Sequence, residues 1–288
     1  MNADEPAAEG LAAEGPAISV IIPASNEAGW IEPCLRALLA SRGVALQVVV
    51  SANACRDDTV TRARAMAPDF AARGWRLDVL DRQEPGKPGA LNAGDAAARH
   101  ALRAYLDADV SVSPPLMAQL AAALAGGAPR YASGTPRVTA RGWVARSYAR
   151  FWCRLPFVAD GVPGFGLFAV NAAGRARWAA FPDIISDDIF ARLQFNPDER
   201  RRVPAPYDWP MVEGLGRLVR VRARQDQGVA EIARLYPDLL ANEGKARPGT
   251  GWLLARALAD PLAFGTYAAV ALAVKRGSGD QSGWVRGR

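Results

Sequence analysis

The sequence offers few of the side chains on which nucleophilic and zinc sites depend. His100 is the only histidine, and it lies in an alanine-rich segment with a helical pattern. We therefore expect it to be structural rather than part of a His-dependent triad. Cys34, Cys55 and Cys153 lack the paired spacing of a zinc site or a disulfide framework. These three cysteines favour a reducing, cytoplasmic compartment.

Long hydrophobic runs are also missing. Residues 261–274 form an uninterrupted stretch of fourteen apolar or small residues, whereas a membrane-spanning helix needs about 20. The stretch predicts one of two arrangements. It is either a helix packed on the domain or an interfacial helix that places Trp252, Tyr267 and Lys275 near lipid headgroups. In the second case the protein would lie peripherally on the inner face of the membrane.

Acidic residues are in the minority, with 29 Asp and Glu against 35 Lys and Arg and a formal net charge of +6. Arginine-rich stretches at residues 199–202 and 217–224 indicate an anionic partner. Aromatic residues do not interleave with these stretches, and no helix-turn-helix or zinc signature is present. We therefore exclude nucleic acid and expect a phosphorylated ligand or a lipid surface.

The chain alternates strand-like and helix-like segments after a polar start. Residues 1–16 are rich in Ala, Glu, Pro and Gly without an apolar period, which predicts a disordered tail. Strands are expected over residues 17–25, 46–53, 75–82 and 104–110, and helices over residues 32–41, 57–67 and 90–103. This order predicts an α/β fold with a mostly parallel sheet, right-handed crossovers and ligand loops at the carboxyl ends of the strands.

Asp107 and Asp109 follow the strand expected at residues 104–110. With 19 aspartates in 288 residues, roughly one Asp-x-Asp is expected by chance, so the position of the pair matters more than its existence. A carboxylate near a core is costly to desolvate unless it is paired or bound to metal. Asp109 is therefore a candidate ligand for Mg²⁺ or Mn²⁺, which prefer oxygen donors. The alternative is a solvated turn that caps the next helix.

Three further loops carry polar residues to the same expected edge of the sheet. They contribute Pro23, Ala24, Asn26 and Glu27 after the first strand, Asn53 after the second, and Lys87 and Asn92 before and within the helix at residues 90–103. Glycines beside Lys87 let the backbone approach a phosphate, to which the ammonium adds a point charge. An ordinary surface lysine is the alternative.

Taken in order, these motifs resemble the family 2 glycosyltransferases, which are inverting enzymes with the nucleotide-sugar-binding GT-A fold. The resemblance covers roughly residues 17–235 and rests on "PASNEA", "GKPGALNAG", "DAD" and "SDDIFARL". It implies that the first two motifs bind the nucleotide and its diphosphate, that Asp109 binds metal, and that Asp107 faces the ribose or the metal and its water shell. It also implies a Rossmann-like sheet flanked by helices and followed by a C-terminal helical extension.

The loop after the second predicted strand, which the resemblance implies contacts the nucleotide base, departs from the family pattern. Many relatives carry two consecutive aspartates where this chain has Ala52 and Asn53. Asn53 can donate to and accept from a uracil edge, so a UDP-sugar is favoured as donor. Asp57 and Asp58, further along the loop, can be helix caps or ligand contacts.

The second half of the chain supplies the acceptor side and the base. The glycine-rich segment around Gly164 resembles the family segment that lines the sugar site. Inverting transfer needs a carboxylate to deprotonate the acceptor hydroxyl; Asp188 matches that base, and Asp187 precedes it. Two consecutive acids at a helix start can also be caps.

Arg222, Arg224 and Gln225 only partly match the family's Gln/Arg-Arg-Trp signature, because no Trp follows. The two arginines can clamp a diphosphate, or the Val/Arg alternation over residues 217–224 can be a half-buried edge strand. The incomplete signature favours transfer of a single sugar to a carbohydrate or lipid-linked acceptor in envelope or exported-glycan synthesis.

We expect four regions: a tail over residues 1–16, a nucleotide-sugar-binding half over 17–110, an acceptor and catalytic half over 111–235, and a helical extension over 236–288. A nucleotidyltransferase of similar fold or a non-catalytic nucleotide-sugar-binding protein are the alternative functions. The oligomeric state is not predicted.

Overall fold

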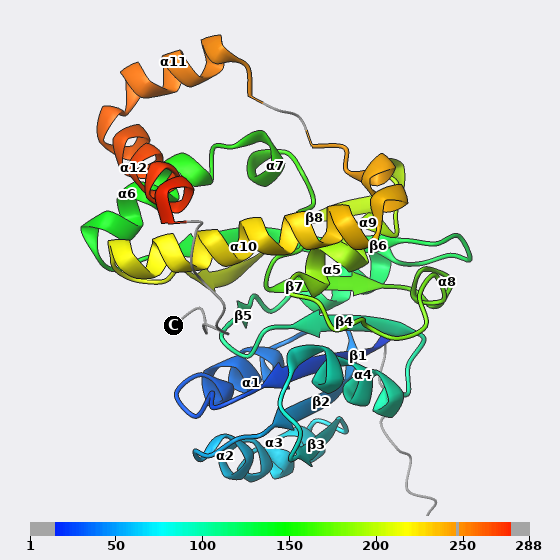
Figure 1. The fold of residues 1–288 in the computed structure, drawn as a ribbon. Helices are drawn as coiled ribbons and strands as arrows, with labels where there is room; N and C mark the ends of the chain where they lie inside the picture. The colour runs from blue at the N-terminus through cyan, green and yellow to red at the C-terminus, as the bar shows by residue number, and fades with distance from the viewer. Residues whose placement is uncertain (1–14, 246–247, 278–288) are drawn as a thin grey trace, which may run out of the picture.

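The protein is described by a computed structural model that covers residues 15–245 and 248–277 (Figure 1). The tail expected over residues 1–16 therefore lies, except for Gly15 and Pro16, outside the described residues.

Eight strands form one sheet with the order β3-β2-β1-β4-β7-β6-β8-β5. Their bounds are β1 (Ala17–Ala24), β2 (Ala45–Asn53), β3 (Arg76–Arg82), β4 (Leu102–Leu106), β5 (Ser111–Val112), β6 (Tyr131–Thr139), β7 (Leu167–Val170) and β8 (Arg200–Pro210). From β3 to β4 all neighbours are parallel, whereas β7 runs antiparallel to both β4 and β6. The parallel half is the predicted one, and it brings the carboxyl ends of β1, β2 and β4 to one edge.

The helices cover both faces of this sheet and form a further layer at one end of it (Figure 1). Their bounds are α1 (Ile31–Leu39), α2 (Thr59–Ala65), α3 (Ala67–Ala72), α4 (Lys87–Ala97), α5 (Leu116–Ala123), α6 (Trp143–Trp152), α7 (Pro156–Ala159), α8 (Ala172–Arg175), α9 (Asp187–Leu193), α10 (Leu215–Leu235), α11 (Thr250–Ala259) and α12 (Pro261–Gly277), with short 3-10 helices at Pro197–Glu199 and Pro237–Asn242.

Alternate residues of β1 supply two separate cores, as the period of a strand requires. Ile18, Val20 and Ile22 pack in one core with α1, α3 and α5. Ile21 points the other way, into a second core with α4, α9 and α10. The sheet is therefore the middle of three layers, which confirms the predicted α/β class.

A third apolar cluster lies beyond the sheet, among α6, α10, α11 and α12. In Figure 1, α10 (yellow) crosses in front of the strands, and α11 and α12 (orange to red) lie beside α6 at the top. The rings of Trp252 and Tyr267 pack on Phe151 of α6, with centroids 6.0 and 4.7 Å away. The C-terminal stretch thus packs on the domain. Within the two described ranges, no helix has both the length and the hydropathy needed to cross a membrane.

The structure corrects two boundary predictions. The helix expected over residues 90–103 runs from Lys87 to Ala97, and β4 begins at Leu102. Helix α4 ends at Ala97 because Ala98 adopts an extended conformation. The N–H groups of Arg99 and His100 then donate to Ser19 Oγ instead of to helix carbonyls. His100 therefore lies in a loop rather than in a helix.

The edge-strand alternative for residues 217–224 is wrong, because they belong to α10. The buried residues of this helix, Leu218, Gly228 and Ile232, follow a helical rather than an alternating spacing. The predicted helix over residues 57–67 is divided into α2 and α3 at Met66.

Candidate active site

The predicted loops meet at one cavity of about 580 Å³ at the carboxyl ends of the parallel strands. Most predicted site residues line it: Pro23, Asn26, Glu27, Asn53, Lys87, Asp107, Asp109, Gly164, Asp187, Asp188, Arg222 and Arg224. Ala24 and Asn92 are not among the lining residues. Ala24 is buried within β1, and the Asn92 side chain exchanges two hydrogen bonds with the backbone of Phe181.

Hydrogen bonds between two loops shape the side of the cavity that follows β1 and β2. Asn26 Oδ1 accepts from the Arg56 N–H at 2.7 Å, and the Glu27 N–H donates to Thr59 Oγ1 at 2.7 Å. Asp57 in turn accepts from the Thr59 N–H and hydroxyl. Burial of Asp57 acts against its charge, but these hydrogen bonds keep its pKa below the ordinary value. This carboxylate therefore fixes the loop.

Asn53 joins three segments at the end of β2. Its Nδ2 donates to the Ala24 carbonyl at 2.9 Å, and its Oδ1 accepts from the Gly86 N–H at 3.2 Å, just before α4. The side chain is only 4% exposed and still lines the cavity. Asn53 thus sets the distance between β1, β2 and the start of α4.

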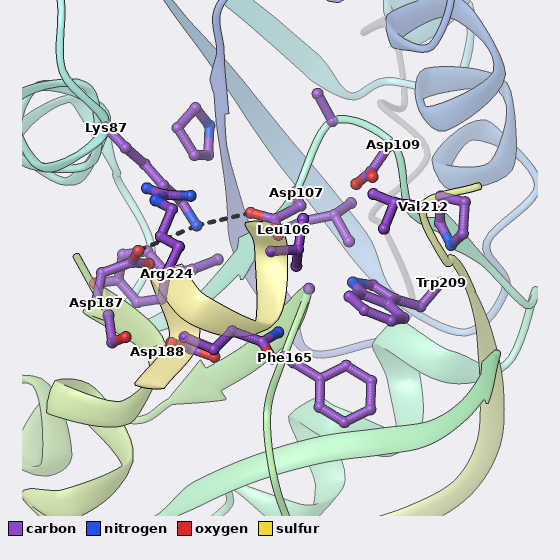
Figure 2. Close-up of a pocket in the computed structure, with 18 of the residues that line it drawn as sticks. Lys87, Leu106, Asp107, Asp109, Phe165, Asp187, Asp188, Trp209, Val212 and Arg224 are labelled. Atoms are coloured by element: carbon purple, nitrogen blue, oxygen red, sulfur yellow. Dashed lines mark ion pairs between the residues drawn. The ribbon is translucent and has the colours of Figure 1, made fainter. Parts of the chain in front are cut away.

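Lys87 connects the two halves of the cavity. Its Nζ lies 2.9 Å from Asp107 Oδ1, after β4, and 3.1 Å from Asp187 Oδ1, at the start of α9 (Figure 2). Lys87 is the first residue of α4, and Gly86 before it has φ +121°, a conformation that favours glycine. The backbone there sends Lys87 into the cavity.

The carboxylates around Lys87 hold it charged. Burial alone would lower the pKa of Lys87, but Asp107, Asp187 and Asp188 together raise it above its ordinary value. For Asp187, burial raises the pKa from its ordinary value of 3.8 to about 6, against the lowering effect of Lys87. Burial has the larger effect because the Asp187 side chain is only 6% exposed.

Asp107 and Asp109 supply oxygen donors on a short turn after β4. The Asp107 N–H donates to the Gly166 carbonyl at 2.9 Å, which fixes the turn beside β7. In the described parts of the chain, no three His, Cys, Asp or Glu side chains converge on a metal site. A Mg²⁺ site typically takes one or two carboxylates and completes its shell with phosphates and water. The two aspartates fit that pattern, and the Lys87 ammonium shows that Asp107 accepts a cation.

Asp188 lies in the first turn of α9 and lines the cavity. The segment before it is held by α10, since the Ile185 N–H donates to Glu231 Oε2 at 2.8 Å. One turn earlier on α10, a Cβ at Gly228 would overlap Ser186 Oγ, so only glycine allows this close approach. Helix α10 therefore sets the position of Asp188.

An apolar wall lines a further part of the cavity, and of its residues only Phe165, beside Gly164, falls in a segment that the sequence analysis assigned to the sugar site. Trp152, Phe165 and Trp209 line the cavity, with ring centroids 5.0–5.7 Å apart. Tyr148 and Leu218 extend the wall along α6 and α10. These residues follow the spacing of ordinary core residues in the sequence, so only the tertiary fold shows that they face a cavity.

The two arginines predicted as a clamp differ in their surroundings. Arg222 is bound within the helical layer, where its Nε lies 2.9 Å from Asp226 Oδ1 and its Nη1 lies 3.4 Å from the Tyr267 hydroxyl. Arg224 reaches into the cavity beside Lys87 in Figure 2. Arg224 is therefore the better placed of the two to meet an anion.

Solved structures with the same fold include glycosyltransferases. A mannosyltransferase from Pyrobaculum calidifontis, in complex with GDP-Man and Mn²⁺, superposes with a TM-score of 0.57 at 24% identity, over 90% of this chain and 75% of that one. Glucosyl-3-phosphoglycerate synthase from Mycobacterium tuberculosis, with Mn²⁺, UDP and glucosyl-3-phosphoglycerate, gives 0.53 at 21% identity over 76% and 79%. These likenesses show the GT-A fold.

Two curated proteins match shorter stretches. The uncharacterized glycosyltransferase EpsJ of Bacillus subtilis is 30% identical over 105 residues, which cover 36% of this chain and 29% of EpsJ. The succinoglycan biosynthesis protein ExoO of Rhizobium meliloti is 37% identical over 99 residues, 34% of this chain and 27% of ExoO. The matches thus span less than a third of either relative. The family model described as glycosyl transferase family 2 matches residues 19–178, more than half of the chain. The protein belongs to glycosyl transferase family 2.

Proposed function

We propose that the protein is an inverting glycosyltransferase that moves a sugar from a nucleoside-diphosphate sugar to an acceptor hydroxyl. One observation carries the proposal: carboxylates from two separate segments, the β4 turn and the start of α9, line one cavity with Lys87 between them (Figure 2). Such an arrangement can bind a diphosphate at one side and deprotonate an acceptor at the other.

Asp188 is the proposed catalytic base. The acceptor hydroxyl attacks the anomeric carbon from the face opposite the diphosphate, and its proton passes to the Asp188 carboxylate. The glycosidic C–O bond breaks as the new bond forms, and its electron pair leaves on the diphosphate. Asp187 is buried and paired with Lys87, so its proposed role is to position that lysine and the start of α9.

Lys87 and Arg224 are the proposed binding groups for the diphosphate. Both line the cavity, and a phosphate oxygen near Lys87 Nζ would take the place now held by Asp107 or Asp187. Asp109 and Asp107 would hold Mg²⁺ or Mn²⁺, which neutralises the charge that develops on the leaving diphosphate. The complexes of the related folds with Mn²⁺ support this choice of ion.

A UDP-sugar is the proposed donor, although the similar structures include complexes with UDP and with GDP-Man. The proposed acceptor is a carbohydrate or a lipid-linked sugar, in agreement with the name of ExoO as a succinoglycan biosynthesis protein. We place the enzyme in the cytoplasm, at the inner face of the membrane, in the synthesis of an envelope or exported glycan.

The decisive experiment compares Asp188→Asn with the parent protein. The substitution keeps the shape but removes the basicity, so transfer should fall by about two orders of magnitude or more while donor binding is retained. A panel of nucleotide sugars, screened by thermal shift with and without Mn²⁺, first identifies the donor; steady-state transfer rates then decide.

Asp187→Asn is the matched control and should lose less activity, because Asp187 is paired with Lys87. Near-parental transfer by Asp188→Asn would remove the base assignment and favour a non-catalytic nucleotide-sugar-binding protein.

A further inference from the structure

The helical layer next to the apolar wall carries the most exposed apolar side chains of the molecule. Among the described residues, the five most exposed large hydrophobic side chains all belong to α6, α11 and α12: Trp143 (64%), Leu254 (66%), Leu258 (85%), Leu262 (56%) and Leu272 (54%). No residue of α11 is buried. Large apolar side chains gathered on one layer mark an interaction surface.

Three of these exposed leucines recur every four residues of the sequence along α11 and the start of α12, and they are called the leucine row below. Leu254 and Leu258 lie one turn apart on α11, and Leu262 follows in the first turn of α12. The inner side of the same layer is already occupied, because Trp252 and Phe264 pack on Phe151. The leucine row therefore adds nothing to the core, and α11, which carries two of its members, lies at the edge of the molecule in Figure 1.

The charges on the three helices that carry these exposed side chains, α6, α11 and α12, have one sign. Helices α6, α11 and α12 contain five basic residues and no acidic one: Arg146, Arg150, Arg256, Lys275 and Arg276. Asp260, between α11 and α12, is paired with Arg150 and Arg154, at 3.1 and 3.3 Å. Exposed apolar side chains on helices that also carry basic residues are what an anionic bilayer surface recognises.

We propose that the row Leu254, Leu258 and Leu262, with Arg256, Lys275 and Arg276, binds the surface of an anionic lipid bilayer. The leucines would enter the boundary between headgroups and acyl chains, and the basic side chains would meet the lipid phosphates. Trp252 and Tyr267, the residues expected at the headgroups from the sequence, instead face inward and anchor the layer.

This surface deepens the proposed function by naming the acceptor class, and that step alone rests on the proposed function. Tyr148 and Trp152 of the cavity wall belong to α6, on which α12 packs. A membrane bound to α11 and α12 would therefore lie next to the apolar end of the cavity. That position suits an acceptor sugar carried on a lipid.

The test is sedimentation of the full-length protein with vesicles of phosphatidylcholine, with and without phosphatidylglycerol, and without nucleotide or acceptor. The parent should bind only the vesicles with phosphatidylglycerol, more weakly at high salt. Leu254→Gln/Leu258→Gln/Leu262→Gln should weaken vesicle binding at least about tenfold. The variant lacks the three apolar side chains whose transfer from water into the bilayer favours binding.

Two control variants match this one. Val229→Gln/Leu235→Gln/Leu240→Gln changes side chains that are 39–43% exposed on other elements and should bind as the parent does. Arg42→Gln/Arg62→Gln/Arg99→Gln removes three exposed charges from the nucleotide half and should bind better than Arg256→Gln/Lys275→Gln/Arg276→Gln.

Three outcomes would overturn the proposal: no binding to anionic vesicles, equal binding by the leucine variant and the parent, or a dimer that the leucine variant converts to a monomer without loss of vesicle binding. Because nucleotide-sugar binding is measured separately by thermal shift, failure of vesicle binding leaves the transferase proposal untouched, and the reverse also holds.

Discussion

The two sides of the cavity are built in different ways. On the nucleotide side, Asn53 and Asp57 tie one loop to another by hydrogen bonds, Asp57 by accepting from the Ala28 N–H at 3.1 Å. On the acceptor side, the rings of Trp152, Phe165 and Trp209 pack on one another. Hydrogen bonds specify direction, whereas apolar packing specifies volume. We infer that the first side selects the orientation of a polar donor and the second tolerates acceptors of different outline.

Beneath the nucleotide side lies a buried charge network centred on Asp95 of α4. Asp95 of α4 accepts from Arg103 Nη1 at 2.6 Å, from the Tyr105 hydroxyl at 2.7 Å and from Arg175 Nε at 2.7 Å. It thereby joins α4, which begins with Lys87, to β4 and α8. The pKa of Tyr105 is raised well above its ordinary value, first by burial and then by Asp95.

The largest effect is expected from breaking this network. Asp95→Ala should lower the free energy of unfolding by about 3–5 kcal/mol, because it leaves two arginines without their carboxylate in a buried site. Urea denaturation followed by circular dichroism measures the change. Asp81→Ala, at an exposed aspartate 3.8 Å from Arg64, should stay within about 0.5 kcal/mol of the parent. Equal losses in both variants would contradict the importance of the network.

Removing the Lys87 ammonium tests whether the nucleotide side of the cavity binds the diphosphate. Lys87→Gln should weaken nucleoside-diphosphate binding by about tenfold to a hundredfold, whatever the base, since a charge-assisted contact to phosphate is lost. Isothermal calorimetry with a panel of nucleoside diphosphates checks this. Arg64→Gln, which removes an exposed charge on α2, serves as control. A loss confined to one base would instead assign Lys87 to base recognition.

Asp187 allows a test by pH. Its folded pKa, raised by burial to about 6, exceeds the ordinary value of 3.8. Between these values the folded state retains a proton that the unfolded state releases, so the stability that Asp187 contributes is full below about pH 4 and is lost as the pH rises through 6. The asparagine of Asp187→Asn does not titrate. Relative to the parent, the free energy of unfolding of this variant should therefore increase by roughly 1–3 kcal/mol between pH 4 and pH 7.

Thermal unfolding without added metal or nucleotide measures this gain at each pH. The difference in the free energy of unfolding between Asp187→Asn and the parent should be constant above pH 7. A difference that shrinks from pH 4 to pH 7 would mean that the ion pair with Lys87, rather than burial, dominates the pKa of Asp187.

The smallest effect is expected on the acceptor side. Trp209→Leu should raise the KM for the acceptor about tenfold, because an aromatic contact surface is lost. The dissociation constant for the donor should stay within about twofold of the parent. Steady-state kinetics and donor calorimetry separate the two. If donor binding falls as much as acceptor affinity, the two sides of the cavity are not independent.

The parallel half of the fold could be predicted from the sequence, because its strands are continuous apolar runs and its ligand loops follow them directly. That local rule predicted that Asp107, Asp109 and Lys87 meet at one edge of the sheet, and all three line one cavity there; their roles stay a prediction. The helix end at Ala97 was not, since it depends on Ser19, which is distant in sequence. The Val/Arg alternation in residues 217–224 fits both a strand and a helix, and only the packing of Leu218 and Val219 in the third apolar cluster decides for α10.

The acceptor wall escaped prediction for a related reason. Trp152 and Trp209 lie in no motif singled out in the sequence, and their exposure to a cavity depends on where α6 and α10 lie relative to the sheet. Gly228 gave a weak signal, as a glycine within a long helix costs stability unless it has a packing role. The structure supplies that role in its contact with Ser186.

Helix α10 lines the cavity with its first half and holds the segment before Asp188 with its second half. Leu218 and Arg224 face the cavity, and one to two turns later Gly228 and Glu231 hold the segment before Asp188. Because one continuous helix carries both sets of residues, we expect an acceptor that displaces the first half of α10 to displace the segment before Asp188 as well. Size discrimination among acceptors would then be felt as a change in turnover as well as in affinity, and the two readouts should rise and fall together along a series of acceptors of increasing bulk.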